Sequence, residues 1–244
     1  MDRSMRRHAL WIAKAMARTD LTPLRESDIE ALTALCRERH VEPGEVLLRM
    51  GEPVSTIFVV RSGEIHLALR GQLGARQTVQ RIRSGGVVGD LPMLCEQPMP
   101  LDALAGEHST LLELPHDGLV AVLQRSPTLS LRWMTSLAKR FEETQRRLIT
   151  VLTADLDAQL ASMLLDERER DAEHGWVVRL SHGVLAGMLG ARRQSVSRVI
   201  ARFRRSGLVT SGYRRIVLHD LGTLAAIAGE VPPASDEPFA APDA

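Results

Sequence analysis

Cationic and amide side chains repeat along the segment 192–206 at a spacing that could read nucleic acid. Apolar residues three and four positions apart predict a helix with one buried face: Val196, Val199, Ile200 and Phe203. The other face of its N-terminal half carries polar residues: Arg193, Gln194, Ser197 and Arg198. Guanidinium groups bind phosphate or guanine bidentately, and an amide can pair with adenine in the same way. The predicted chemistry of this segment is therefore contact with DNA.

Other elements must position this helix. Ser181 can cap a preceding short helix, and Gly190 permits the tight turn that follows it. Gly207 is placed to end the second helix, and short β-rich runs at 208–210 and 215–218 predict a hairpin. Helix, turn, helix and hairpin in this order predict a winged helix-turn-helix, whose second helix enters the major groove by its N-terminal half.

The simplest alternative is an amphipathic helical pair whose basic face is only solvated. The local charge argues against it. From Gly190 to Arg215 the chain has eight arginines and no acidic residue. Positive charge without local neutralisation suits a phosphate backbone.

The segment also resembles the CRP/FNR family of bacterial transcription regulators. The family pattern is matched at Leu180, Ser181, Leu185, Ala186, Leu189, Gly190, Arg193, Val196, Ser197, Arg198 and Ile200. A weaker resemblance extends over nearly the whole chain. The family usually has Glu where this chain has Gln194, and because a carboxylate only accepts hydrogen bonds, the preferred operator should differ from the commonest family half-site.

The DNA-binding candidates combine this pattern with the exposed cations. They are Ser181, Arg192, Arg193, Gln194, Ser195, Ser197, Arg198, Arg202 and Arg214. We expect Arg193 and Arg198 to contact guanine or phosphate, and Gln194 to select bases. Ser195 and Ser197 are expected to make backbone or close-approach contacts. Arg192, Arg202 and the wing residue Arg214 are assigned to phosphates.

Composition limits the remaining possibilities. The 244 residues suffice for one large or two ordinary domains, and the formal net charge of +1 implies that acidic residues elsewhere offset the basic C-terminal third. Two cysteines suit a reducing cytoplasm, and no apolar run approaches the ~20 residues that span a bilayer. We find no paired carboxylates, nucleophile with a base, or phosphate loop, so an enzyme is not expected.

The N-terminal half indicates a sensor domain. Residues 1–40 predict a helical arm, with helices over about 1–18 and 25–37. From residue 41 short β-rich runs alternate with glycine turns, which predicts a jelly-roll or small barrel over 41–126. This region resembles the cyclic-nucleotide-binding domain of the same family.

The resemblance implies an effector pocket at Gly89, Asp90, Thr144 and Gln145. In the family a glycine and a glutamate precede an arginine that holds the cyclic phosphate. Here Asp90 replaces the glutamate, and Met99 and Pro100 stand where the arginine would be. Because a buried anion without a charged partner is costly, we expect cyclic AMP to bind weakly if it is the effector, and no cofactor is certain.

Other sensing chemistries have less support. His66, His108 and His116 lack metal-ligand spacing, so no metal site is predicted. Cys95 could respond to redox state, but with no neighbouring cation in sequence it is expected to be a small apolar residue of the core.

A dimerisation helix is predicted over 127–153. An unbroken heptad seam runs along it: Leu131, Met134, Ala138, Phe141, Gln145, Leu148 and Leu152. The alternative is a helix packed on its own domain, but such a seam favours a parallel coiled coil between two copies.

Residues 154–230 then form the DNA-binding domain, with Asp155 and Asp220 as helix caps. Within it, the charged run over 166–175 indicates a solvated helix end and loop rather than a site. Residues 231–244 have the composition of a disordered tail.

The sequence as a whole predicts an α+β chain with a jelly-roll sensor, a dimerisation helix and a winged helix-turn-helix. We expect a cytoplasmic homodimeric transcription regulator that binds inverted repeats in double-stranded DNA, without membrane contact. The family resemblance adds RNA polymerase as a partner. The competing interpretation is a cyclic-nucleotide-binding module that acts through protein contacts.

Overall fold

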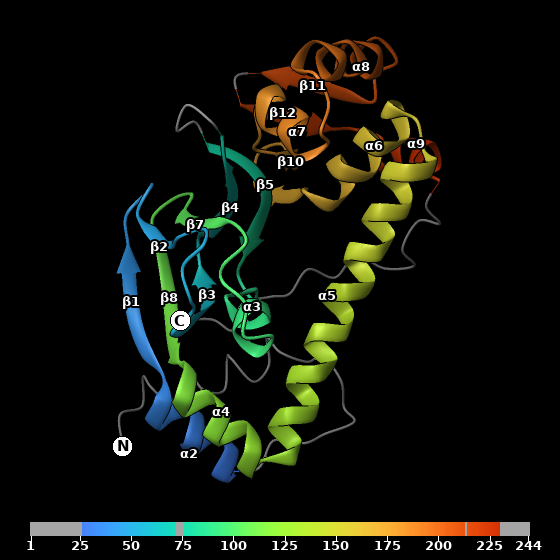
Figure 1. Cartoon of the computed structure of the whole chain (residues 1–244). Coiled ribbons are helices and arrows are strands. Elements are labelled where there is room, and N and C mark those ends of the chain that lie inside the picture. The colour runs from blue at the N-terminus through green and yellow to red at the C-terminus, as the bar shows by residue number, and fades with distance from the viewer. Residues whose placement is uncertain (1–25, 72–75, 213, 230–244) are drawn as a thin grey trace. The chain divides into compact units, whose positions relative to one another are not determined.

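The structure is a computed structural model that describes residues 26–71, 76–212 and 214–229 (Figure 1). The chain divides into two compact units, Met1–Gln145 and Arg146–Ala244. The predicted first helix of the arm and the predicted tail over 231–244 lie outside the described residues. Among the described helices, none is both long enough and apolar enough to cross a membrane.

Two antiparallel four-stranded sheets form the centre of the first unit, as a jelly-roll requires. One sheet has the order β1-β8-β3-β6, with the bounds Arg37–Val41, Ser109–Pro115, Thr56–Ser62 and Val87–Val88. The other has the order β2-β7-β4-β5, with the bounds Val46–Leu48, Asp102–Ala105, Glu64–Arg70 and Arg76–Arg83. The predicted fold class is confirmed.

The apolar run in β3 reflects a strand that is covered on both sides. Phe58 and Val60 belong to the core cluster that also contains Ile65 of β4, whereas Ile57 and Val59 belong to a second cluster with residues of the helices. Successive side chains of a strand point to opposite faces, so a strand with two buried faces has no polar alternation.

Helices accompany these sheets. Those in the described part of the chain are α2 (Glu26–Leu35), α3 (Asp90–Leu94), α4 (His116–Arg125) and α5 (Pro127–Thr153). α2 is two residues shorter than predicted at its C-terminal end, because Arg37 already begins β1. The sensor boundary at residue 41 is therefore too late: β1 is an edge strand with charged, largely exposed side chains, which hid it in the sequence.

The second unit combines helices with one small sheet. Its described helices are α6 (Leu156–Asp166), α7 (His182–Met188), α8 (Arg193–Arg205) and α9 (Leu221–Ala228). Its strands are β9 (Glu169–Asp171), β10 (Gly175–Val178), β11 (Val209–Gly212) and β12 (Arg215–Leu218), in the order β11-β12-β10-β9. The prediction of a helix end and loop over 166–175 is wrong in part, because Glu169–Asp171 pairs with β10 as a strand.

Candidate nucleic-acid interface

Local sequence signals fix the two helices of the motif. The Ser181 hydroxyl accepts a hydrogen bond from the Val184 N–H at 3.2 Å, which caps α7 as predicted. Gly190 takes a φ of 63° in the turn, and Gly207 a φ of 74° after α8. A side chain would be strained at both positions, so glycine allows the chain to reverse there.

The buried side of α8 anchors it to the second unit. Val196, Val199, Ile200 and Phe203 are all buried in one cluster that includes Leu185 of α7 and Ile216 of β12. This burial confirms the predicted inward face. The opposite side of the helix is consequently held toward solvent.

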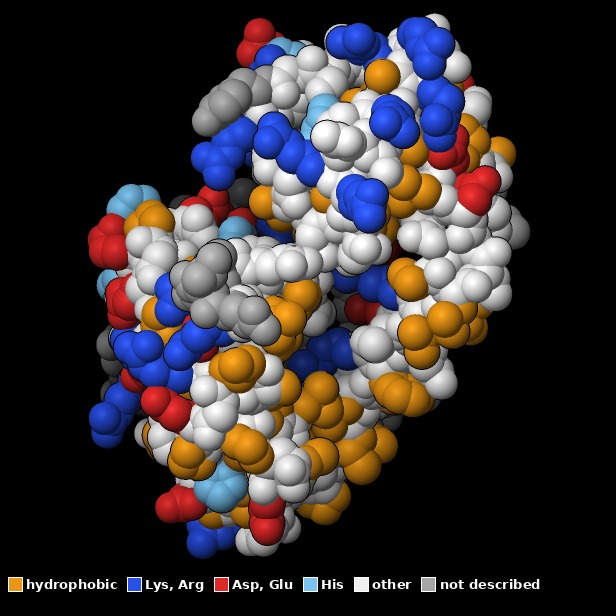
Figure 2. Space-filling view, turned by 45° about the horizontal axis from the view of Figure 1, so that its top comes forward, with side chains coloured by type: hydrophobic (Ala, Val, Ile, Leu, Met, Phe, Trp, Pro, Cys, Tyr) orange, Lys and Arg blue, Asp and Glu red, His pale blue; other side chains and the backbone are white. Residues whose placement is uncertain are grey.

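The outward side of α8 brings four of the predicted residues together. They line an open hollow of about 670 Å³: Arg193, Gln194, Ser197 and Arg198. Arg193, Gln194 and Arg198 are exposed, and Ser197 is half-buried. Figure 2 shows arginine side chains, in blue, gathered on a face of the second unit. Three exposed groups with bidentate hydrogen-bonding capacity thus share one surface.

The wing follows α8 directly. β11 and β12 pair antiparallel, with Gly212 opposite Arg215 at the end of the hairpin. Arg214 lies in the turn with a φ of 52° and is exposed. The predicted hairpin is confirmed, although β11 continues to Gly212 rather than ending at residue 210.

The arginines of this surface differ in whether a carboxylate neutralises them. Within the part of the chain that the structure describes, Arg193, Arg198 and Arg214 have no carboxylate partner. Arg202, in contrast, is paired with Asp157 of α6, with Nε 3.1 Å from Oδ2. A phosphate would therefore have to compete with a carboxylate distant in sequence for the guanidinium of Arg202.

A histidine that the sequence did not single out joins the motif to the wing. Nδ1 of His182 lies 3.0 Å from Oγ of Ser197, and Nε2 lies 3.2 Å from Oγ of Ser211. Burial, and then the nearby Arg193, lower the pKa of His182 below its ordinary value. The only sequence signal was its place directly after the helix cap, which does not reveal these long-range partners.

The predicted effector pocket contains an ion pair that no local pattern predicts. Asp90 is buried at the start of α3, and its Oδ1 lies 3.2 Å from Nη1 of Arg140 on α5. A second contact joins Oδ2 to Nη2 of the same arginine. Thr144 and Gln145 are exposed on α5, one helical turn beyond Arg140. A cation is therefore present next to Asp90, but the carboxylate already neutralises it.

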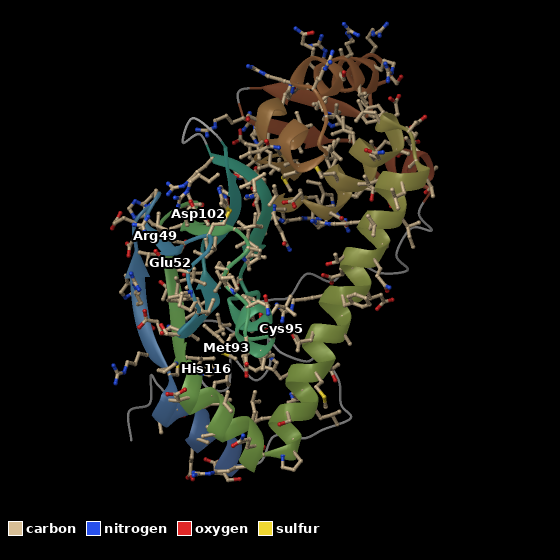
Figure 3. The ribbon with its side chains drawn as sticks, viewed as in Figure 1. Arg49, Glu52, Met93, Cys95, Asp102 and His116 are labelled. Atoms are coloured by element: carbon tan, nitrogen blue, oxygen red, sulfur yellow. The ribbon has the colours of Figure 1, made fainter. Side chains whose placement is uncertain are left out.

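Two residues near α3 lie differently from what we expected. Cys95 is exposed rather than part of the core, because it follows the last turn of α3 (Figure 3). Met99 is buried in the cluster between the two sheets. Of the two residues that stand where the resemblance implies an arginine, Met99 is therefore in the core, and Pro100 is exposed but has no side-chain donor for a phosphate.

The heptad seam on α5 is almost wholly exposed. Its large apolar members are solvent-accessible: Leu131, Met134, Phe141, Leu148 and Leu152. Phe141 is 64% exposed and Leu152 74%. Such a row of accessible apolar side chains is unusual on a surface that stays in water.

The chain is similar to known proteins across both units. Residues 38–126 match the family model of a cyclic nucleotide-binding domain, and residues 158–227 match that of a Crp-like helix-turn-helix domain. The HTH-type transcriptional regulator Cmr of Mycobacterium tuberculosis is 35% identical over 214 residues, which are 88% of this chain and 85% of the relative. The transcriptional activator protein anr of Pseudomonas aeruginosa is 25% identical over 208 residues, with 83% and 85% covered.

Solved structures give the same result. A transcriptional regulator of the CRP/FNR family from Thermus thermophilus superposes with a TM-score of 0.68 at 26% identity. The match covers 80% of this chain and 99% of that protein. The similarity in sequence and in fold therefore includes both the sensor and the helix-turn-helix.

Proposed function

The chain belongs to the CRP/FNR family of transcription regulators, with a helix-turn-helix DNA-binding domain, and on this premise we propose that it binds inverted-repeat operators as a homodimer. The observation that carries the proposal is the outward side of α8. Three exposed residues with bidentate capacity surround a hollow there, and its arginines have no carboxylate partner among the described residues. Phosphate is the anion that would neutralise them.

Each contact has a proposed role. Arg193 and Arg198 bind guanine or phosphate, and Gln194 selects the base by its amide. Ser195 and Ser197 approach the duplex closely. Arg192 and Arg214 bind phosphates on either side of the groove. Ser181 is already used as the cap of α7, so it supports the site through the helix end and contacts DNA by its exposed edge.

The two-fold arrangement is proposed from the exposed seam of α5. A parallel pair of α5 helices would bury Met134, Phe141, Leu148 and their seam neighbours. Two recognition helices would then enter successive major grooves ~34 Å apart. We further propose a cytoplasmic location and contact with RNA polymerase, both in line with the family.

Cyclic AMP is proposed as no more than a weak effector. The residues described around Asp90 do not form a free cation cradle for a cyclic phosphate, because Arg140 is paired with the Asp90 carboxylate. A phosphate would have to compete with that carboxylate for the same guanidinium. Gly89, Asp90, Thr144 and Gln145 remain the proposed pocket, with Arg140 added to it.

The test is a binding titration by fluorescence anisotropy at fixed salt. Duplexes are first selected by the full-length protein from a random DNA pool, and their scrambled versions serve as controls. We expect the selected duplexes to be inverted repeats that the protein binds at least ~10³-fold more tightly than their scrambled versions. Addition of cyclic AMP should change these affinities little. Equal affinity for both duplexes would contradict the proposed function, and binding that requires cyclic AMP would contradict the proposal that cyclic AMP is only a weak effector.

A further inference from the structure

One imidazole connects α7, α8 and β11 of the second unit. His182 is the first residue of α7, and its ring nitrogens contact Ser197 on α8 and Ser211 on β11 at 3.0 and 3.2 Å. Ser211 is half-buried in the wing. The His182 side chain thus contacts both the recognition helix α8 and the wing.

The protonation of the His182 ring also determines whether the Ser197 hydroxyl donates or accepts a hydrogen bond. A neutral imidazole has one N–H donor and one acceptor nitrogen. When Nδ1 carries the hydrogen, it donates to Ser197, whose own hydroxyl hydrogen can then point toward another acceptor. When Nε2 carries the hydrogen, Ser197 must donate to Nδ1 and offers only lone pairs. Because Ser197 lines the hollow with Arg193 and Arg198, this choice changes what the surface offers to DNA.

We propose that His182 is a positioning residue for DNA recognition, which holds the wing against α8 and sets the hydrogen-bonding direction of Ser197. The inference rests on the proposed function, because it assumes that this surface meets DNA. It goes further in assigning a role to a residue that does not itself line the hollow. Loss of the imidazole should therefore affect affinity through two neighbours rather than through a lost direct contact.

A dependence on pH follows from the same geometry. Among the described residues, Arg193 of α8 is the charged group that acts on His182, whereas α8 and β11 contact its ring through uncharged hydroxyls. The unbound protein therefore disfavours the imidazolium. Protonation would make both nitrogens donors, release both hydroxyl hydrogens toward DNA and add a charge that phosphates attract. Affinity for the operator should rise as the pH falls through the pKa of His182.

The test is a double-mutant cycle on the full-length protein. His182→Phe, Ser211→Ala and the double variant are titrated with the selected duplex and its scrambled control. We expect each single change to weaken operator binding about fivefold, the value of one hydrogen bond. The double variant should bind no more weakly than His182→Phe, because that change already removes the bond to Ser211.

The control variants separate this role from simple packing. His182→Asn is smaller and keeps a polar group near the position of Nδ1, so it should bind more tightly than His182→Phe. In His174→Phe a histidine of the same unit that contacts Asp171 is replaced, and the pH dependence should persist. In His182→Phe the rise in affinity as the pH falls below the ordinary histidine pKa of about 6.5 should disappear.

The outcomes are distinct. Three results would each overturn the inference alone: wild-type affinity in His182→Phe, Ser211→Ala and their double variant; additive losses in the double variant; or an unchanged pH profile in His182→Phe. A wild-type protein that binds scrambled and selected duplexes equally would overturn the proposed function, and the inference with it.

Discussion

Individual arginines of the second unit differ in charge environment more than in exposure. Arg198 and Arg214 have no carboxylate partner among the described residues, while Arg202 is held by Asp157. An ion pair must be broken before a guanidinium can bind phosphate at full strength. The number of arginines in a segment is therefore a poor measure of its affinity for DNA. The carboxylate partner of each arginine determines how strongly it can bind phosphate.

Arg198 and Arg214, two of the arginines without a carboxylate partner among the described residues, should have separable effects. Arg198→Ala should lose discrimination between the operator and a scrambled duplex, because it removes the proposed base contact in the groove. Arg214→Ala should weaken binding to both duplexes alike. It should also reduce the magnitude of the slope of log affinity against log salt by about one. Anisotropy titrations over a salt series measure both. Equal losses on both duplexes for both variants would contradict the assignment of roles.

In the first unit, Asp102 is a buried carboxylate on β7. Its Oδ1 accepts hydrogen bonds from the Met50 N–H at 2.9 Å and from Arg70 Nη2 at 2.8 Å, and its Oδ2 accepts one from Arg76 Nε at 2.9 Å. Burial by itself raises the pKa of Asp102, but these donors outweigh it and hold the pKa at about 2. The charged form is therefore the one that stabilises the fold.

Acid should remove this stabilisation. Because the pKa is lower in the folded than in the unfolded protein, the contribution is complete above about pH 4 and is lost as the pH falls toward 2. We expect Asp102→Asn to lower the free energy of unfolding by about 2 kcal/mol at pH 7, with the difference from wild type narrowing below pH 4. Urea unfolding monitored by circular dichroism at several pH values measures this difference in the free energy of unfolding. Asp117→Asn, at an almost fully exposed side chain that pairs with His116, should lower the free energy of unfolding by only a few tenths of a kcal/mol.

Among the elements, α5 combines two kinds of surface. Leu129, Arg132 and Trp133 are buried near its start, whereas its seam from Leu131 to Leu152 is exposed (Figure 2). The first set packs the helix onto the sensor. The second set has no covering partner among the described residues, which is the arrangement that a helix pair would complete.

A charge in the seam should separate the two copies. Phe141→Glu would place two carboxylates opposite each other across a two-fold axis, so we expect sedimentation velocity to show monomers at concentrations where the wild type is a dimer. Glu143→Gln is the matched control, since it changes the charge by one on the opposite side of the helix and should remain dimeric. A wild type that sediments as a monomer, or an unaffected Phe141→Glu dimer, would refute the seam as the interface.

At the scale of the whole molecule, the two-fold symmetry of the proposed homodimer determines how the two half-sites must be spaced. Two identical recognition helices engage both halves of an inverted repeat only when the half-sites lie on the same side of the duplex. The affinity of the dimer should therefore depend on half-site spacing as well as on sequence.

Changing the spacing tests this directly. Insertion of about five base pairs, half a helical turn, between the half-sites rotates one of them to the other side of the duplex. We expect the affinity to fall to that of a single half-site. Anisotropy titration of the altered duplex, beside one in which one half-site is scrambled, provides the comparison. Unchanged affinity would show that each copy binds alone.

The sequence alone determined the features that neighbouring residues encode. The two sides of α8 follow from the helical period, and the caps at Ser181, Asp155 and Asp220 follow from side chains three residues from their partners. The jelly-roll strands from β2 to β5, the wing and the long α5 were visible for the same reason. Short-range patterns need no knowledge of the rest of the chain.

The tertiary structure decided the contacts between distant residues. Asp90 meets an arginine 50 positions away, Arg202 a carboxylate 45 positions away, and His182 a wing serine 29 positions away. The edge strands β1 and β9 were missed because their charged side chains show no apolar alternation, and only pairing with β8 and β10 makes them strands. Such partners depend on how the chain packs, which no local pattern specifies.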